Sequence, residues 1–94
     1  MNPSKGDSYI TYEEILEKVS DGIANQLGIH KWEVKPESLV AAELGADSLD
    51  MVEIVMHVED YFEIEILDSE MSRLSTVQDW VNLVCEKRGV KKEE

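Results

Sequence analysis

The stretch Gly45-Ala46-Asp47-Ser48-Leu49-Asp50 decides the fold, because it closes a long connection and opens a strongly patterned helix. Asp47 has the position of an N-cap residue, whose side chain accepts a hydrogen bond from an otherwise unpaired N–H of the first helical turn. Ser48 is then the first helical residue, with its hydroxyl at the mouth of the helix. No general base or second catalytic side chain stands near it in the sequence. A serine presented in this way is a poor nucleophile but is well placed to be modified by another enzyme.

The helix opened by this stretch is predicted to run from Ser48 to Tyr61 or Phe62. At about 100° per residue, one apolar arc must face a core: Met51, Ile54, Val55, Val58, Tyr61 and Phe62. Three apolar residues fall on the outer side, among acidic ones: Leu49, Val52 and Met56, with Glu53, Glu59 and Asp60. Scattered surface apolar residues are common and mean little. Three on one stripe, ringed by carboxylates, favour a docking face that supplies apolar contact area and attracts a basic partner.

Capping patterns predict the other helices. The first begins after Thr11, with Glu14 at capping-box spacing, and stops at Gly28. Its apolar face recurs with helical period: Ile15, Leu16, Val19, Ile23 and Leu27. A short helix is expected near residues 68–73, and a last one between Thr76 and Gly89, with Cys85 on its apolar side. The connection over residues 29–47 can be held to a core by its own apolar residues: Ile29, Val34, Leu39 and Leu44.

The resulting fold class is all-α, a small four-helix bundle of three long helices and one short helix, with no sheet. We expect a flexible tail over residues 1–10, the domain over residues 11–89 and a charged tail over residues 90–94. With 94 residues and 43% apolar content, the chain fits one folded domain. His30 and His57 are too isolated for catalysis or metal binding and are interpreted as surface residues.

Charge and composition exclude several classes of function. Nine basic against twenty-one acidic residues give a formal charge of −12, which repels nucleic acid and anionic lipid and attracts proteins with basic patches. Charges interrupt every apolar run, so no membrane span is expected, and the first ten residues do not resemble a signal peptide. The single cysteine, Cys85, supports neither a disulfide framework nor a metal-ligand set and is expected to be a buried thiol. We therefore expect a cytoplasmic monomer, or the mature form of a plastid or mitochondrial protein.

The chain resembles the acyl carrier protein family at residues 44–50 (LGADSLD), and again at Val52-Glu53 and Glu59-Asp60-Tyr61-Phe62. An Asp-Ser-Leu tripeptide alone is weak evidence, but its place in a four-helix pattern from Thr11 to Arg88 makes the match specific. The resemblance implies a carrier rather than an enzyme. It implies that a separate transferase esterifies Ser48 with a 4′-phosphopantetheine arm from coenzyme A, with Asp47 and Leu49 beside the arm. Acyl groups then ride on the terminal thiol of that arm as thioesters.

The resemblance also assigns roles to two further sets of residues. The first set would bind basic patches on partner enzymes: Asp47, Leu49, Asp50, Val52, Glu53, Met56, Glu59, Asp60 and Asp68. The second set would line a space for the acyl chain, although simple core packing also explains it: Ile54, Val58, Phe62, Ile66, Leu74 and Val81. The chain departs from the family pattern at Leu67, where proline is usual, and has one extra residue between Ser38 and Gly45. Trp80 is interpreted as a structural filler, and the sequence leaves open whether Trp32 packs or is exposed.

The sequence supports three hypotheses for the function. The leading one is a free-standing carrier of growing fatty acyl chains, with a phosphopantetheinyl transferase and fatty acid synthesis enzymes as partners. The second is a carrier of polyketide, aminoacyl or D-alanyl groups. The third is an acidic adaptor that docks through the helix beginning at Ser48 and is never loaded.

Overall fold

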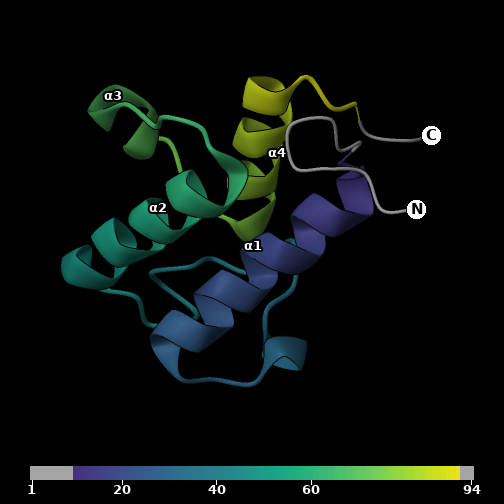
Figure 1. Ribbon diagram of the computed structural model, residues 1–94. Coiled ribbons are helices and arrows are strands. Elements are labelled where there is room, and N and C mark those ends of the chain that lie inside the picture. The colour runs from purple at the N-terminus through teal and green to yellow at the C-terminus, as the bar shows by residue number, and fades with distance from the viewer. Residues whose placement is uncertain (1–9, 92–94) are drawn as a thin grey trace.

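A computed structural model describes residues 10–91, and over these residues the chain forms four α-helices and one 3-10 turn (Figure 1). The elements are α1 (Tyr12–Leu27), η2 (Lys31–Glu33), α2 (Ser48–Phe62), α3 (Asp68–Met71) and α4 (Val77–Arg88). Their only sheet-like pairing within the described residues is an isolated bridge between Leu39 and Thr76. The all-α bundle of three long helices and one short helix is therefore confirmed.

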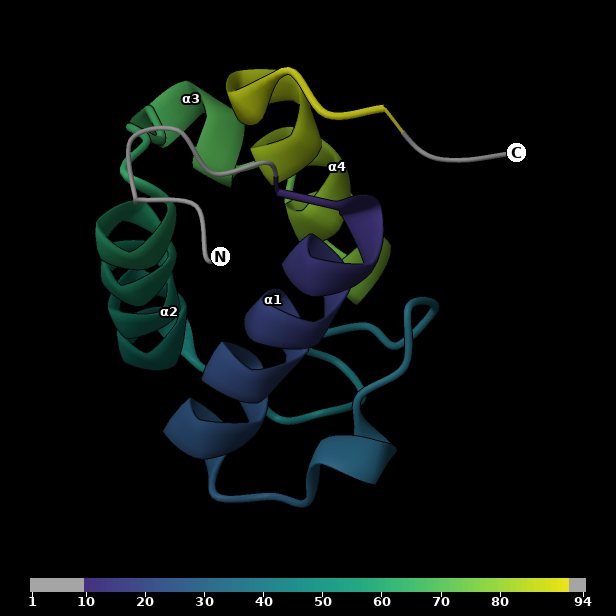
Figure 2. The same ribbon diagram turned by 45° about the vertical axis from the view of Figure 1, so that its right-hand side comes forward.

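Helix α1 is the centre of the bundle, because it packs against both α2 and α4. Figure 2 shows α2 to the left of α1 and α4 behind the upper end of α1, with α3 at the top between α2 and α4. The core is made almost entirely of aliphatic side chains, as the low aromatic content requires. Its fully buried members come from all three long helices and the connection: Ile15, Val19, Ile23, Val40, Ile54, Val58, Phe62, Val77, Trp80, Val81 and Val84.

The helix ends follow the predicted caps. The Thr11 hydroxyl accepts the N–H of Glu14 at 3.1 Å, and α1 ends at Gly28 with φ of 68°. Helix α4 likewise ends at Gly89 with φ of 71°. Positive φ is tolerated at little cost by glycine, which explains why both helices stop there. Helix α3 ends at Met71, and residues 72–73 continue as a turn, so the expected range of 68–73 was slightly too long.

Two residues that the sequence pattern predicted to face the core, Leu39 and Tyr61, are exposed. Leu39 is exposed, and the neighbouring Val40 is buried instead, because the N–H of Val40 donates to the carbonyl of Ser75 and turns its side chain inward. Tyr61, predicted on the buried arc of α2, is 46% exposed. It lies at the edge of that arc, where its ring packs edge-on against Phe62 and beneath the Lys18 ammonium. Of the other connection residues, Val34 is buried, and Ile29 and Leu44 pack partly against the core.

Ile10 and Val90 also pack partly against the core. The remaining tail residues, 1–9 and 92–94, lie outside the described part of the chain, so the two predicted tails stay predictions. Cys85 is buried, and burial raises the pKa of its thiol. None of the helices within residues 10–91 is long and apolar enough to cross a membrane.

Asp79 carries a pH-dependent share of the stability. Its Oδ2 accepts the N–H groups of Ser75 and Thr76, both at 2.9 Å. The N–H of Thr76, then burial in the opposite sense and the N–H of Ser75, leave the pKa of Asp79 below its ordinary value of 3.8. A lowered folded pKa means that this stabilisation is complete above the unfolded pKa and is lost as the pH falls through the folded one.

We expect Asp79→Asn to lower the free energy of unfolding by about 1 kcal/mol at pH 7, because an amide accepts these N–H groups less strongly than a carboxylate. Urea unfolding at pH 7 and near pH 3 measures the effect. The difference in the free energy of unfolding between the two proteins should be smaller near pH 3 than at pH 7. A gap that is equal at both pH values would contradict the assignment.

Candidate functional site

Ser48 is the first residue of α2 and is exposed. A reciprocal pair of hydrogen bonds closes the helix mouth around it: the N–H of Asp50 donates to Asp47 Oδ1 at 2.9 Å, and the N–H of Asp47 donates to Asp50 Oδ2 at 3.1 Å. Within the described residues the N–H groups of Ser48 and Leu49 make no hydrogen bond. These two groups, at the positive end of the helix dipole, suit a phosphate bound at the serine.

Asp50 also links the site to α1. Gln26 Nε2 donates to Asp50 Oδ1 at 3.2 Å. This bond from Gln26, followed by the N–H of Asp47, holds the pKa of Asp50 below its ordinary value. Asp50 is therefore a carboxylate at neutral pH, and it fixes the start of α2 relative to α1. The sequence pattern did not reveal its hydrogen bond with Gln26, which joins two helices.

The backbone before the serine turns sharply to reach the helix. Gly45 has φ of 86°, a conformation that side-chain-bearing residues rarely adopt. Ala46, the next residue, is buried, and its N–H donates to the carbonyl of Val40. These contacts hold the loop against the core directly before Asp47, so that Ser48 has a fixed position on the surface.

A hollow of about 360 Å³ lies beside Ser48, between the first turns of α2 and the short helix α3. It is lined by Ser48, Met51, Val52, Asp68, Met71 and Ser72. Met51 and Met71 are half-buried, and the lining is mostly apolar. A flexible arm attached to the serine could lie here without leaving the protein surface.

The outer stripe of α2 is exposed, as the sequence pattern predicted. Leu49, Val52 and Met56 are 68%, 44% and 57% exposed. Glu53, Asp60 and Asp68 are exposed as well. Glu59 differs from these acids: it is half-buried, and its Oε2 accepts the N–H of Ile66 at 2.8 Å, so it holds the connection after α2. The role of the stripe in partner binding stays a prediction.

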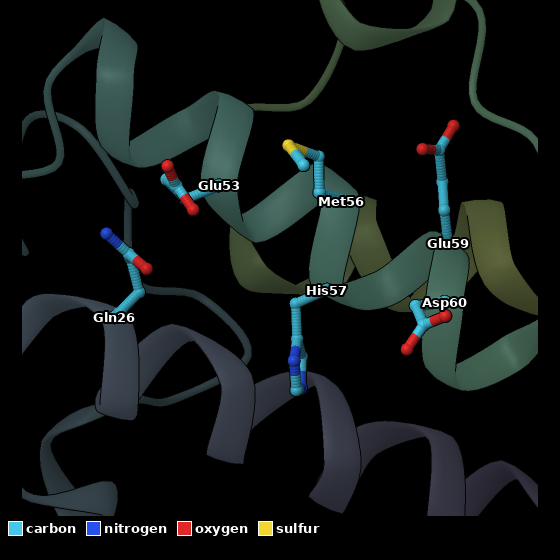
Figure 3. Close-up of a pocket in the computed structure, with 6 residues that line it drawn as sticks. All are labelled: Gln26, Glu53, Met56, His57, Glu59 and Asp60. Carbon is cyan, nitrogen blue, oxygen red and sulfur yellow. The ribbon is translucent and has the colours of Figure 1, made fainter.

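A second hollow, of about 650 Å³, lies along this stripe where α2 faces α1 (Figure 3). Its lining is Gln26, Glu53, Met56, His57, Glu59 and Asp60. His57 is exposed, as expected, but its ring points toward α1 (Figure 3). There it fills a notch at Gly22, where an added Cβ would come within 2.6 Å of its Cδ2. This contact joins residues 35 positions apart, so no local sequence signal could have revealed it.

The six residues expected to line a space for an acyl chain are all buried. Their exposed fractions are at most 8%, and they belong to one continuous core cluster. Ile54 and Val58 continue the row that begins at Met51 in the hollow beside Ser48. Their role toward a cargo stays a prediction. Within the described residues, no group of three or more His, Cys, Asp or Glu side chains could hold a metal ion.

Comparisons with known proteins agree with this geometry. Residues 17–84 match the family described as "Phosphopantetheine attachment site". The chain is 41% identical over 78 residues to an acyl carrier protein of Chlorobium phaeobacteroides, covering 83% of this chain and 100% of that protein. It is 50% identical over 70 residues to an acyl carrier protein of Clostridium acetobutylicum, covering 74% and 91%.

The matching domain defines a protein that bears a phosphopantetheine group. More narrowly, the chain belongs to the acyl carrier protein family, which confirms the resemblance seen in the sequence. It is a carrier and not an enzyme, and its cofactor is covalently attached 4′-phosphopantetheine. Within the described residues, the exposed serine, the two unpaired N–H groups at the start of α2 and the apolar hollow next to them fit such a group.

Proposed function

We propose that Ser48 is the attachment point of 4′-phosphopantetheine and that the loaded protein carries growing fatty acyl chains to fatty acid synthesis enzymes. The observation that carries this proposal is the position of Ser48. Ser48 is exposed at the start of α2, beside an apolar hollow and two N–H groups that have no partner among residues 10–91. A phosphodiester formed there is stabilised by the helix dipole.

The surroundings of Ser48 support a carrier that meets many enzymes. A basic partner would meet the apolar residues Leu49, Val52 and Met56, with the carboxylates of Glu53, Asp60 and Asp68 close by. The formal charge of −12 attracts such a partner over a longer range. A tethered substrate has a high effective concentration at each docked enzyme, which is the physical advantage of the arm. We propose residues 11–89 as the unit that does this, acting as a monomer in the cytoplasm.

The test is the intact mass of the protein after incubation with coenzyme A and a phosphopantetheinyl transferase. We expect the gain of one phosphopantetheinyl group by the unchanged protein and no gain by Ser48→Ala. Ser72→Ala is the matched control, because Ser72 is another exposed serine in the same hollow, and it should load normally. A gain that survives Ser48→Ala would move the attachment point elsewhere.

The cargo needs a separate measurement. The mass of the species attached to protein purified from its source distinguishes fatty acyl groups from polyketide, aminoacyl and D-alanyl groups. We expect a series of acyl masses that differ by two-carbon units. An aminoacyl mass would retain the carrier function and replace the fatty acid role.

A further inference from the structure

Trp32 is the most exposed of the large apolar side chains within residues 10–91, with an exposed fraction of 73%. It lies in the middle of η2 and does not pack into the core, a point that the sequence left open. A tryptophan ring can bury about 150–250 Å² of surface, and an exposed ring adds little to the stability of a fold. Tryptophan is also among the residue types most enriched at the centres of protein interfaces.

The backbone that carries Trp32 is fixed on both sides of the residue. Val34, two residues later, is buried in the core. Lys31, the residue before, places its Nζ 3.2 Å from Glu17 Oε2 and 3.3 Å from Asp21 Oδ1, both on α1. These contacts hold η2 against α1, so that the tryptophan has a fixed position on the surface.

The ring of Trp32 is held as well. It is stacked with the ring of His30, with centroids 5.4 Å apart and planes at 10° to each other. The N–H of His30 donates to Glu33 Oε2 at 3.2 Å, and the N–H of Glu33 donates to the carbonyl of His30 at 2.9 Å, which closes the turn that carries both rings. A side chain that is already held in one position loses little conformational freedom on binding, and this favours affinity.

The charges around Trp32 favour a cationic partner. Lys31 is paired with two carboxylates, so that this group of three is negative overall. Glu33 and the exposed Glu37 lie in the same connection, with Lys35 as one further cation. The protein as a whole has a formal charge of −12. An arginine guanidinium can stack on an indole and pair with carboxylates, so it matches both the ring and its surroundings.

The position of Trp32 separates it from the surfaces assigned to loading and docking. Figure 2 shows α2 to the left of α1 and η2 as the short turn at the lower right. Among the described residues, those that line the hollow beside Ser48 and the hollow along the stripe of α2 include none from η2. A partner seated on α2 therefore leaves Trp32 uncovered.

We propose that Trp32 is the centre of a second docking surface, which binds an arginine-bearing segment of another protein while α2 stays free for the enzymes that use Ser48. The guanidinium lies on the indole and within reach of the surrounding carboxylates. Binding of this kind keeps the carrier beside one protein while its other side meets the enzymes, which raises the effective concentration of the cargo. The surface does not depend on the attachment of a group at Ser48.

The experiment uses the full chain and a short peptide of alternating arginine and glycine residues. A peptide with lysine in place of arginine has the same charge and stacks less well on an indole. Binding is followed by the protection of tryptophan fluorescence from acrylamide, which reports Trp32 because Trp80 is only 1% exposed. We expect the arginine peptide to bind about two- to fivefold more tightly than the lysine peptide and to protect Trp32 from the quencher.

Two variants that leave the net charge unchanged test where the peptide binds. Trp32→Ala should lose the preference for arginine, measured by isothermal titration calorimetry. Leu49→Ala is the matched control, because Leu49 is 68% exposed on the stripe of α2, and this variant should keep the preference. Trp32→Ala should also be loaded by a phosphopantetheinyl transferase at the rate of the unchanged protein.

Four results would overturn the inference. Equal binding of the two peptides by the unchanged protein excludes stacking, and loss of the preference in Leu49→Ala moves the site to α2. Slower loading of Trp32→Ala makes Trp32 part of the surface that meets the transferase. A blue shift of Trp32 emission with phosphatidylcholine vesicles but not with the peptide identifies a lipid contact. Absence of loading in every variant contradicts the proposed function alone, since the peptide measurements do not require a loaded protein.

Discussion

Phe62→Ala is expected to lower the free energy of unfolding by about 3–5 kcal/mol, a large share of the 5–15 kcal/mol typical of a small domain. Phe62 is the last residue of α2 and is 1% exposed. Its removal loses the transfer free energy of the ring and leaves a cavity where α2 meets the end of α4. Urea unfolding of the unloaded protein, followed by circular dichroism, measures the change.

Met56→Ala is the matched control for this prediction. It removes a large apolar side chain from the same helix, but one that is 57% exposed. We expect a change within about 0.5 kcal/mol. Similar losses in the two variants would mean that the stripe bearing Met56 is part of the core, and the separation of α2 into a buried and a docking face would then be wrong.

Local signals explain why so much of α2 could be predicted. Asp47, Ser48 and Asp50 are close in sequence, and their capping bonds depend on spacing alone. The helix period then separates Ile54 and Val58 from Leu49 and Val52, because residues on one face recur every three to four positions. The serine and both faces of the helix therefore follow from a short segment.

The errors occur where local pattern is weakest. Tyr61 lies at the edge of the apolar arc, where a small rotation decides between core and solvent, and its hydroxyl favours the solvent. Leu39 and Val40 are adjacent and equally apolar, so only the pairing with Ser75 and Thr76 decides which one is buried. That pairing joins segments about 36 residues apart and leaves no local trace in the sequence.

The contacts between helices also could not be predicted from the sequence. Gln26 with Asp50, Gly22 with His57, and Lys87 with Glu70 each join different elements. The polar residues concerned have no pattern in the sequence that distinguishes them from ordinary surface residues, and Gly22 has no side chain that could indicate a contact. They nevertheless set where α2 and α3 lie, and thereby how Ser48 and its hollow are placed.

The last prediction concerns docking. Glu53→Lys is expected to reduce kcat/KM for loading by a phosphopantetheinyl transferase about tenfold at low ionic strength, because it places a cation in the path of a basic partner. Glu53 is chosen because it is exposed on the stripe. Glu59 is less suitable, because its carboxylate accepts the N–H of Ile66, and a lysine there would disturb the fold. The loss should shrink at high salt, since the screening length falls from about 8 Å at 0.15 M to about 3 Å at 1 M.

Glu86→Lys separates local docking from total charge. Glu86 is exposed on α4, and each variant changes the formal charge by two units, from −12 to −10. If long-range attraction by the whole protein dominated, the two variants would lose loading rate equally. If the partner instead contacts the stripe of α2, Glu53→Lys should be loaded several-fold more slowly than Glu86→Lys. A loss independent of salt in Glu53→Lys would argue for a direct contact in the docked complex in place of steering, because only interactions across solvent are screened.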